Sequence, residues 1–264
     1  MLKLENINKI FNEGTVNEQR IFEGLDFSVK SGDFITILGS NGAGKSTLLN
    51  LIAGTHAADK GKIILADKDI TKLKEHQRAK FIGRVFQNPT FGTSPSMTIL
   101  ENLSLALNKG KTFGLSLGVN KKNITYFREI LTTLNLGLED KLNIKVGALS
   151  GGQRQSLSLL MATLVEPQLL LLDEHTAALD PKTSALIMEL TNNIVQEKKI
   201  TTLMITHNLN HAISYGSRLI MLHKGKVILD ICGEEKSQLT INKLVDYFDS
   251  IKCSDALSDE LMLA

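Results

Sequence analysis

The sequence predicts an α/β fold, in which a core of strands and helices is interrupted by a helical insert. Three observations lead to this prediction. Short apolar runs separated by glycines fill the first third of the 264 residues. Helical periodicity dominates residues 88–165, and short strand patterns return after it. We therefore expect one core whose two sequence segments flank the insert.

The first third is expected to contain strands, then a glycine loop and a helix. The apolar runs predict strands at 2–7, 27–29 and 34–38. Residues 47–53 have a helical pattern that ends at Gly54, a typical C-cap residue. The strand, the loop and the helix together predict a phosphate-binding unit.

The rest of the chain is expected to be helical at first and then mixed. Apolar faces with helical spacing lie at 99–107 and 127–134, and a further helix is expected at 154–165. Strands and helices follow in the last third. The expected strands are 169–172, 202–205, 219–222 and 227–231, the expected helices are 184–197 and 239–248, and residues 254–264 are expected to fray.

Composition and charge exclude several classes of protein. Hydrophobic residues make up 42% and charged residues 22% of the chain, which is ordinary for a globular protein. Thirty Lys and Arg against 28 Asp and Glu leave a net charge of +2, too little for a field dedicated to nucleic acid. The apolar stretches are far shorter than the ~20 residues that span a bilayer, and no signal peptide is visible. We expect an intracellular globular chain that does not cross a membrane.

Residues 39–46 match the phosphate-binding pattern G-x-x-x-x-G-K-[ST]. Glycines let backbone N–H groups converge on phosphate oxygens, and the following helix points its positive end at the same place. Lys45 supplies a cation for the β- and γ-phosphates, and Ser46 supplies an oxygen for Mg²⁺. The alternative is a glycine turn that precedes a helix by chance, but its apolar flanks argue against this. The predicted phosphate-binding residues are Gly39, Ser40, Asn41, Gly42, Ala43, Gly44, Lys45, Ser46 and Thr47.

An acidic pair follows a run of four leucines at 169–172. Such a run is typical of a parallel strand buried on both faces, and ligands bind at the C-terminal ends of such strands. Asp173 is the candidate for the Mg²⁺ shell, and Glu174 is the candidate that polarises the attacking water. A buried strand that ends in a solvated acidic turn is the alternative.

A second glycine turn precedes the helix expected at 154–165. It contains Ser150, Gly151, Gly152 and Gln153 after a leucine. A helix N-terminus of this kind binds anions, so Ser150 and Gly152 are candidates to contact phosphate. Because one γ-phosphate needs only one such cradle from each chain, a second cradle requires an explanation.

With these motifs the chain resembles the ATP-binding-cassette (ABC) ATPase family over nearly its whole length. The resemblance implies a P-loop NTPase (RecA-like) core with an antiparallel β subdomain and an inserted α-helical subdomain. It places the core at 1–87 and 166–264 and the helical subdomain at 88–165. It also explains the second cradle, because in this family the Leu-Ser-Gly-Gly-Gln turn of one subunit closes over ATP held by the other.

The resemblance also assigns roles to single residues. Gln87 looks like the loop glutamine that touches Mg²⁺ and the lytic water, and Asp180 lies in a segment that resembles the loop crossing the dimer interface. His207 looks like the switch histidine that bonds the γ-phosphate. Phe11 is the candidate to stack on adenine, with core packing as the alternative. The implied catalytic residues are Glu174, His207, Gln87 and Lys45, and the implied metal-binding residues are Ser46, Gln87 and Asp173.

One position departs from the common family pattern. Many members carry proline after the catalytic glutamate, whereas this chain has His175. The sequence around it is similar to that of a branch of bacterial cassettes linked to tryptophan or tyrosine uptake. That branch works with a branched-chain-type permease and a lipoprotein receptor. The alternative is that His175 is a neutral substitution.

The resemblance implies an ATPase that powers a membrane transporter from the cytoplasmic face, as a peripheral subunit. The expected cofactors are ATP and Mg²⁺, and the expected partners are a second copy of the chain, permease subunits and, indirectly, a substrate-binding lipoprotein. An importer of amino acids is the leading hypothesis. An exporter or a lipid- or lipoprotein-moving complex is the second, and a soluble cassette acting on DNA or ribosomes is the third, although no nucleic-acid partner is expected.

Overall fold

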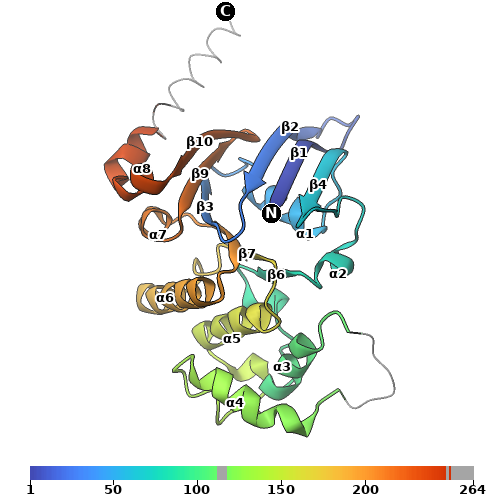
Figure 1. Cartoon of the computed structure of the whole chain (residues 1–264), viewed down its shortest axis with the longest axis vertical. Coiled ribbons are helices and arrows are strands. Elements are labelled where there is room, and N and C mark those ends of the chain that lie inside the picture. Colours follow the sequence, from blue (N-terminus) through green and yellow to red (C-terminus); the bar gives the residue numbers. More distant parts are fainter. Residues whose placement is uncertain (112–117, 248–249, 251–264) are drawn as a thin grey trace, which may run out of the picture.

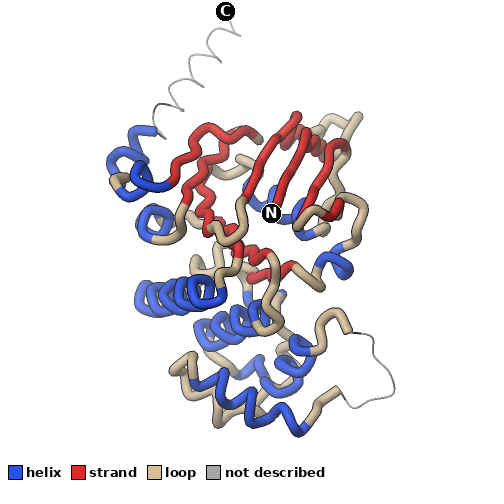
Figure 2. Tube along the Cα trace, in the orientation of Figure 1, coloured by secondary structure: helices blue, strands red, loops and turns tan. Residues whose placement is uncertain are grey.

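A computed structural model describes residues 1–111, 118–247 and 250 of the chain. Strands gather in one part of the molecule, and the helices α3, α4 and α5 lie together in another (Figures 1 and 2). Among the described residues, no helix is long and apolar enough to cross a membrane.

A six-stranded sheet forms the centre of the core. Its strand order is β10-β9-β3-β8-β7-β6. The strands from β9 to β6 run parallel to one another, and β10 pairs with β9 antiparallel at the edge. Every residue of β3 is buried, as expected for a strand with helices or sheets on both faces. The strands are β3 (Phe34–Gly39), β6 (Ile82–Val85), β7 (Leu169–Asp173), β8 (Thr201–Ile205), β9 (Arg218–His223) and β10 (Lys226–Cys232).

The parallel strands bring distant motifs to one edge of this sheet. The glycine loop follows β3, the acidic pair ends β7, and His207 and Gln87 lie two residues beyond β8 and β6. Because the C-terminal ends of parallel strands meet at the same edge, residues separated by more than a hundred positions become neighbours there.

A four-stranded antiparallel sheet packs beside the first. Its order is β2-β1-β4-β5, with β1 (Leu2–Phe11), β2 (Gln19–Val29), β4 (Lys60–Leu65) and β5 (Lys68–Asp69). One hydrophobic cluster combines residues of this sheet, of the larger sheet and of helix α1 (Lys45–Ala53). The apolar face of α1 contributes Leu48, Leu49, Leu51 and Ile52, all buried, so the helix after the glycine loop is anchored in the core.

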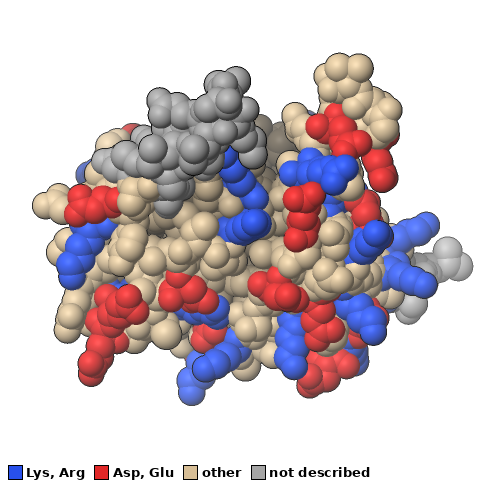
Figure 3. Space-filling model, turned by 90° about the horizontal axis from the view of Figure 1, so that it is seen from above, with Lys and Arg blue, Asp and Glu red and all other residues tan. Residues whose placement is uncertain are grey.

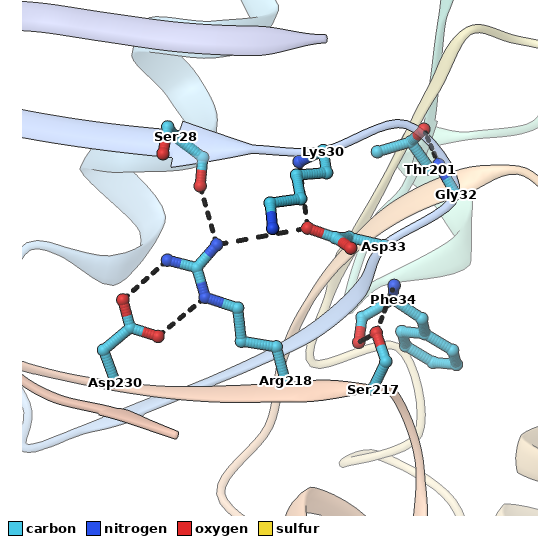
Figure 4. A network of polar contacts seen from close by, with 9 residues as sticks. All are labelled: Ser28, Lys30, Gly32, Asp33, Phe34, Thr201, Ser217, Arg218 and Asp230. Carbon is cyan, nitrogen blue, oxygen red and sulfur yellow. Dashed lines mark hydrogen bonds and ion pairs between the residues drawn. The ribbon is translucent and has the colours of Figure 1, made fainter. Parts of the chain in front are cut away.

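Arg218 joins the two sheets by polar contacts (Figure 4). Its guanidinium donates from Nε and Nη2 to both carboxylate oxygens of Asp230, at 2.6 Å each, and from Nη1 to the Ser28 carbonyl at 2.8 Å. Asp33 Oδ2 lies 4.0 Å from Nη1. A bidentate arginine of this kind fixes orientation as well as distance, so the network sets how the antiparallel sheet sits on the core.

The helices between the two core segments have a hydrophobic cluster of their own. It is built on α3 (Ile99–Leu107), α4 (Ile124–Thr132) and α5 (Gly151–Thr163), together with loop residues such as Leu138 and Val146. Thr98 and Glu101 form a capping box at the start of α3. The subdomain boundaries given above, 87/88 and 165/166, stay predictions.

The remaining helices surround the large sheet. They are α2 (Glu75–Arg78), α6 (Pro181–Lys198), α7 (Leu209–Ser214) and α8 (Gly233–Ser237), with short 3-10 turns at Pro89–Phe91, Lys121–Asn123 and Val146–Ala148. On the face seen in Figure 3, Lys and Arg side chains are interspersed with Asp and Glu. This mixture agrees with the small net charge of the chain.

The predicted α/β fold with a helical insert is confirmed, with corrections to several elements. The strand expected at 2–7 continues to Phe11, and the strand expected at 27–29 already begins at Gln19. Strands β4 and β6 were not predicted, because only part of β4 is buried and because a glycine and an arginine interrupt the apolar residues of β6. The helix expected at 154–165 already begins at Gly151. Of the helix expected at 239–248, residues 241–247 are helical, whereas residues 248 and 254–264 lie outside the described residues.

Candidate nucleotide-binding site

The loop at 39–46 depends on glycine at two positions. Gly39 has φ +154°, and a Cβ atom there would lie 2.3 Å from the Leu222 carbonyl oxygen. Gly44, the residue before α1, has φ +98°, and a Cβ atom there would lie 2.9 Å from Cζ of Phe22. Both positions therefore exclude a side chain by conformation and by space. The tight packing on neighbouring strands holds the loop in one shape.

Lys45 is the buried cation of this loop. Its Nζ donates to the carbonyl oxygens of Gly39 at 2.8 Å and Ser40 at 2.9 Å. Burial lowers the pKa of Lys45, while the negative charges of Glu174 and Asp173 act in the opposite direction. The ammonium group is thus held inside the loop and faces the acidic pair.

A pocket of about 330 Å³ lies between the loop and the antiparallel sheet. It brings together predicted residues from four parts of the sequence: Phe11, the glycine loop, Glu174 and His207. In the described part of the chain, Gln87, Asp173, Asp180 and the turn at 150–153 do not line it. The lining residues are Phe11, Gln19, Ile21, Asn41, Gly42, Ala43, Gly44, Lys45, Ser46, Thr47, Glu174 and His207.

Phe11 stands at the end of β1, where the ring is half-buried at the pocket. The ring makes an edge contact with His56, with centroids 5.2 Å apart, and Lys9 Nζ lies 5.1 Å from its centroid. The ring is therefore not part of the hydrophobic core, which was the alternative interpretation. Its placement suits an aromatic contact with a planar ligand.

Glu174 and His207 form a close pair above the loop. Glu174 Oε1 lies 2.6 Å from His207 Nε2, and the side chains are 15% and 47% exposed. The backbone of Glu174 has φ +47°, in the left-handed region, and its N–H donates to the Ile205 carbonyl at 3.1 Å. Backbone conformations of this kind persist only where the surroundings hold them, and they turn the carboxylate toward the pocket.

Asp173 has a partner that sequence reasoning missed. Arg84, on β6, places Nη2 3.4 Å from Asp173 Oδ2 and 2.7 Å from Asn50 Oδ1 of α1. An arginine within an otherwise apolar strand was the available signal. The guanidinium connects three elements next to the acidic pair.

The oxygen groups of the site fit a magnesium ion. Ser46 is exposed and lines the pocket. The Asp173 carboxylate interacts electrostatically with the Lys45 ammonium. Hydroxyl and carboxylate oxygens are the donors that Mg²⁺ prefers. Gln87 is exposed just beyond β6.

The turn at 150–153 is organised as a helix N-terminus. Ser150 Oγ accepts from the Gln153 N–H and Gln153 Oε1 accepts from the Ser150 N–H, each at 3.2 Å. This capping box opens α5. A Cβ atom on Gly152 would lie 2.4 Å from Thr183 Cγ2, so the turn packs closely against the start of α6. Asp180 caps that same end of α6, where its carboxylate accepts from the Thr183 N–H at 3.0 Å and this bonding lowers its pKa.

His175 is buried and hydrogen-bonded to helix α6. It is 2% exposed, and its Nε2 lies 3.1 Å from Thr191 Oγ1 of α6. Thr191 donates its own hydroxyl proton to the Ile187 carbonyl at 2.7 Å, so it accepts from His175. Burial, with a smaller contribution from His211, lowers the pKa of His175 to about 3, so the ring is neutral with a proton on Nε2.

Known proteins resemble this chain in sequence and in structure. A tyrosine transport ATP-binding protein from Clostridioides difficile (strain R20291) is 52% identical over 249 residues, 94% of this chain and 99% of that protein. A phosphonates import ATP-binding protein from Lactococcus lactis subsp. cremoris (strain SK11) is 32% identical over 92% of this chain and 98% of its own. A dimeric ATP-binding cassette in a post-hydrolysis state, bound to ADP and Pi, superposes with a TM-score of 0.75 at 31% identity, covering 88% of this chain and 98% of the other.

The family comparison agrees with the site geometry. The family described as ABC transporter matches residues 22–177, which include the glycine loop, the turn at 150–153 and the acidic pair. Since the match covers more than half of the chain, the chain belongs to the ABC transporter family and is an ATP-binding ATPase.

Proposed function

We propose that this chain is the ATP-hydrolysing subunit of a membrane importer for amino acids, with an aromatic amino acid as cargo. The observation that carries the proposal is the 52% identity with a protein named for tyrosine transport, over nearly the full length of both chains. Relatives named for methionine import support the amino-acid class. We expect separate permease chains and a substrate-binding lipoprotein to complete the importer.

In this proposal the pocket holds ATP by complementary groups. The N–H groups of the glycine loop and the positive end of α1 surround the phosphates, and Lys45 neutralises the β- and γ-phosphates. Phe11 stacks on the adenine ring at the other end of the pocket. The residues that bind phosphate are Gly39, Ser40, Asn41, Gly42, Ala43, Gly44, Lys45, Ser46 and Thr47.

Ser46, Asp173 and Gln87 are the groups that we expect to hold Mg²⁺. The ion supplies positive charge to the phosphate oxygens when it is bound. Ser46, which lines the pocket, contributes its hydroxyl, and Asp173 contributes its carboxylate from the end of β7. Gln87 extends from the loop after β6, from the side on which the helical part of the chain begins.

Glu174 and His207 are the expected catalytic pair. The Glu174 carboxylate orients the attacking water and accepts its proton, and the Glu174–His207 contact keeps both side chains at the pocket. His207 and Lys45 then stabilise the negative charge that develops on the transferring phosphoryl group.

A second copy of the chain completes the site in this proposal. Ser150, Gly151, Gly152 and Gln153 lie away from the pocket of their own chain, at the exposed N-terminus of α5. We expect them to dock on the γ-phosphate held by the partner copy, with Asp180 at the interface. The helical part at 88–165 then moves with the turn as one subdomain, relative to the core at 1–87 and 166–264.

A groove of about 530 Å³ between the core and the helical part is the proposed permease site. It is walled by apolar groups, among them the exposed side chains of Phe91 and Leu105, and by the cations Arg84 and Lys109. Phe86, the residue before Gln87, lines this groove. Docking there places the chain at the cytoplasmic face of the membrane.

The test is affinity purification of the Glu174→Gln variant with ATP from detergent-solubilised native membranes, followed by mass spectrometry. We expect permease subunits and a substrate-binding lipoprotein whose bound ligand is an aromatic amino acid. A permease without a receptor would favour export, and soluble partners alone would exclude transport.

The same variant tests the catalytic assignment. Glu174→Gln retains the shape of the side chain but cannot accept a proton, so we expect ATP hydrolysis to fall by roughly 100-fold or more. We expect ATP to convert this variant into a stable dimer, measured by size-exclusion chromatography with light scattering. Hydrolysis at the wild-type rate would contradict the assignment of the base.

A further inference from the structure

Arg84 connects the Asp173 carboxylate, which is proposed to bind magnesium, with helix α1, which follows the glycine loop. Nη2 donates to Asn50 Oδ1 at 2.7 Å and lies 3.4 Å from Asp173 Oδ2, and Nη1 lies 3.3 Å from Thr55 Oγ1. Asn50 belongs to α1 and Thr55 follows it, so the guanidinium is fixed to the segment that carries the phosphate loop. The short bond to Asn50 holds Arg84, and the longer contact reaches Asp173.

The surroundings of Arg84 differ from those of a residue that only stabilises the core. Its side chain is 12% exposed, its Cζ lies 4.5 Å from the Phe86 ring centroid, and it forms part of the wall of the 530 Å³ groove. Its buried Nε has no hydrogen-bond partner among the residues that the structure describes. A well-packed arginine normally uses all its donors, so the position of Arg84 is set by the contacts of Nη1 and Nη2.

Asp173 therefore interacts with two cations of its own chain. Arg84 approaches its Oδ2, and the Lys45 ammonium interacts with its charge from the loop side. A carboxylate has enough lone pairs for an arginine and a metal ion together, but the guanidinium and a divalent cation repel each other at such short range. The Asp173 side chain is only 17% exposed, so dissolved salt screens this repulsion little.

We propose that Arg84 is a positioning residue that shares the Asp173 carboxylate with Mg²⁺ and thereby weakens metal binding at the nucleotide site. The inference rests on the proposed role of Asp173 as a metal-binding residue. Arg84 keeps the carboxylate in place when no metal is bound, and its charge keeps the metal exchangeable when nucleotide is bound.

The test compares ADP affinity in Mg²⁺ with ADP affinity in EDTA, because the ratio of the two Kd values reports metal binding and not hydrolysis. We expect Arg84→Met, which removes the charge, to increase the effect of Mg²⁺ on ADP affinity by about tenfold. Arg84→Lys retains the charge and is expected to keep the wild-type ratio within about twofold. Thr55→Val removes a contact of Arg84 without changing charge and is the matched control, with an unchanged ratio.

The variant Asp173→Asn separates the two possible failures. If it leaves the effect of Mg²⁺ unchanged, Asp173 does not hold the metal and the proposed site is wrong. If it reduces that effect while Arg84→Met leaves it unchanged or reduces it as well, the inference about Arg84 is overturned. Binding of ADP in EDTA checks that each variant is folded, and Arg84→Gln replaces Arg84→Met if the latter does not fold.

Discussion

At the scale of single residues, Lys45 is held by the backbone of its own loop. Its ammonium donates to the Gly39 and Ser40 carbonyls, and burial lowers its pKa. Phosphate oxygens offer the same cation stronger, charged acceptors. Under the proposed function, the groups that hold Lys45 therefore place it beside the phosphates.

Lys45→Ala is expected to weaken ATP binding by roughly tenfold to 100-fold, because a charge-assisted bond contributes about 1.5–3 kcal/mol. Titration of the purified chain with a fluorescent ATP analogue measures this loss. Lys45→Arg, which keeps the charge with a different shape, serves as the comparison. An unchanged affinity in Lys45→Ala would contradict the assignment of the loop.

His175 is expected to hold the segment after Glu174 through its bond to Thr191. His175→Phe retains a ring but removes the donor, so we expect a loss of about 1–2 kcal/mol in the free energy of unfolding and a lower kcat with little change in KM. His175→Gln keeps a donor and is expected to lie closer to the wild type. Urea unfolding and steady-state kinetics measure both effects. Equal values for the Phe and Gln variants would mean that the bond contributes nothing.

At the scale of elements, helix α1 has a polar clamp at its C-terminal end as well as the glycine loop at its start. Arg78 is 2% exposed, and Nη1 donates to the carbonyls of Leu51 at 2.7 Å and Ile52 at 2.9 Å. Its other nitrogens donate to the Leu73 and Thr71 carbonyls. A cation at this end of a helix interacts favourably with the helix dipole.

Arg78→Leu is expected to reduce the free energy of unfolding by about 3 kcal/mol or more, because it leaves buried carbonyl groups without donors. Arg78→Lys, which keeps the charge but has fewer donors, is expected to lose less. Chemical unfolding in urea measures the difference. A loss below about 1 kcal/mol for Arg78→Leu would show that water or other groups replace the clamp.

At the scale of the whole molecule, Lys236 attaches the short helix α8 to the central sheet. Its Nζ donates to the carbonyls of Tyr215 and Gly216, just before β9. Burial lowers the pKa of Lys236 to about 8 from an ordinary value of 10.5. Between these two values the unfolded chain binds more protons at this residue than the folded chain, so its contribution to stability rises with pH.

We therefore expect the wild type to gain stability relative to Lys236→Met as the pH rises from about 8 to about 10, by at most about 1.4 kcal/mol per pH unit. Below pH 8 the difference between the two proteins is expected to stay constant. The free energy of unfolding of both proteins is measured in urea from pH 7 to 10. The titrating groups that the two proteins share contribute equally, so they cancel in the difference. Parallel stability curves throughout would contradict the lowered pKa.

Much of the fold was predictable because its elements carry local signals. The runs at 34–38 and 169–172 are apolar throughout, so burial on both faces followed directly from them. Strand β6 was missed because a glycine and an arginine interrupt its apolar residues, and β4 because only part of it is buried. Both strands exist through pairing with distant neighbours, β6 with β7 and β4 with β1, which no local pattern encodes.

The sequence by itself determined the glycine loop, the acidic pair and the family, because their chemistry requires particular residues at fixed spacing. Only the tertiary structure decided which of these residues meet. It joins Glu174 to His207, seats Phe11 at the pocket, and places Arg84 against Asp173 across two strands. The physical reason is the parallel sheet, which brings the C-terminal ends of strands distant in sequence to one edge, at distances that depend on register and packing.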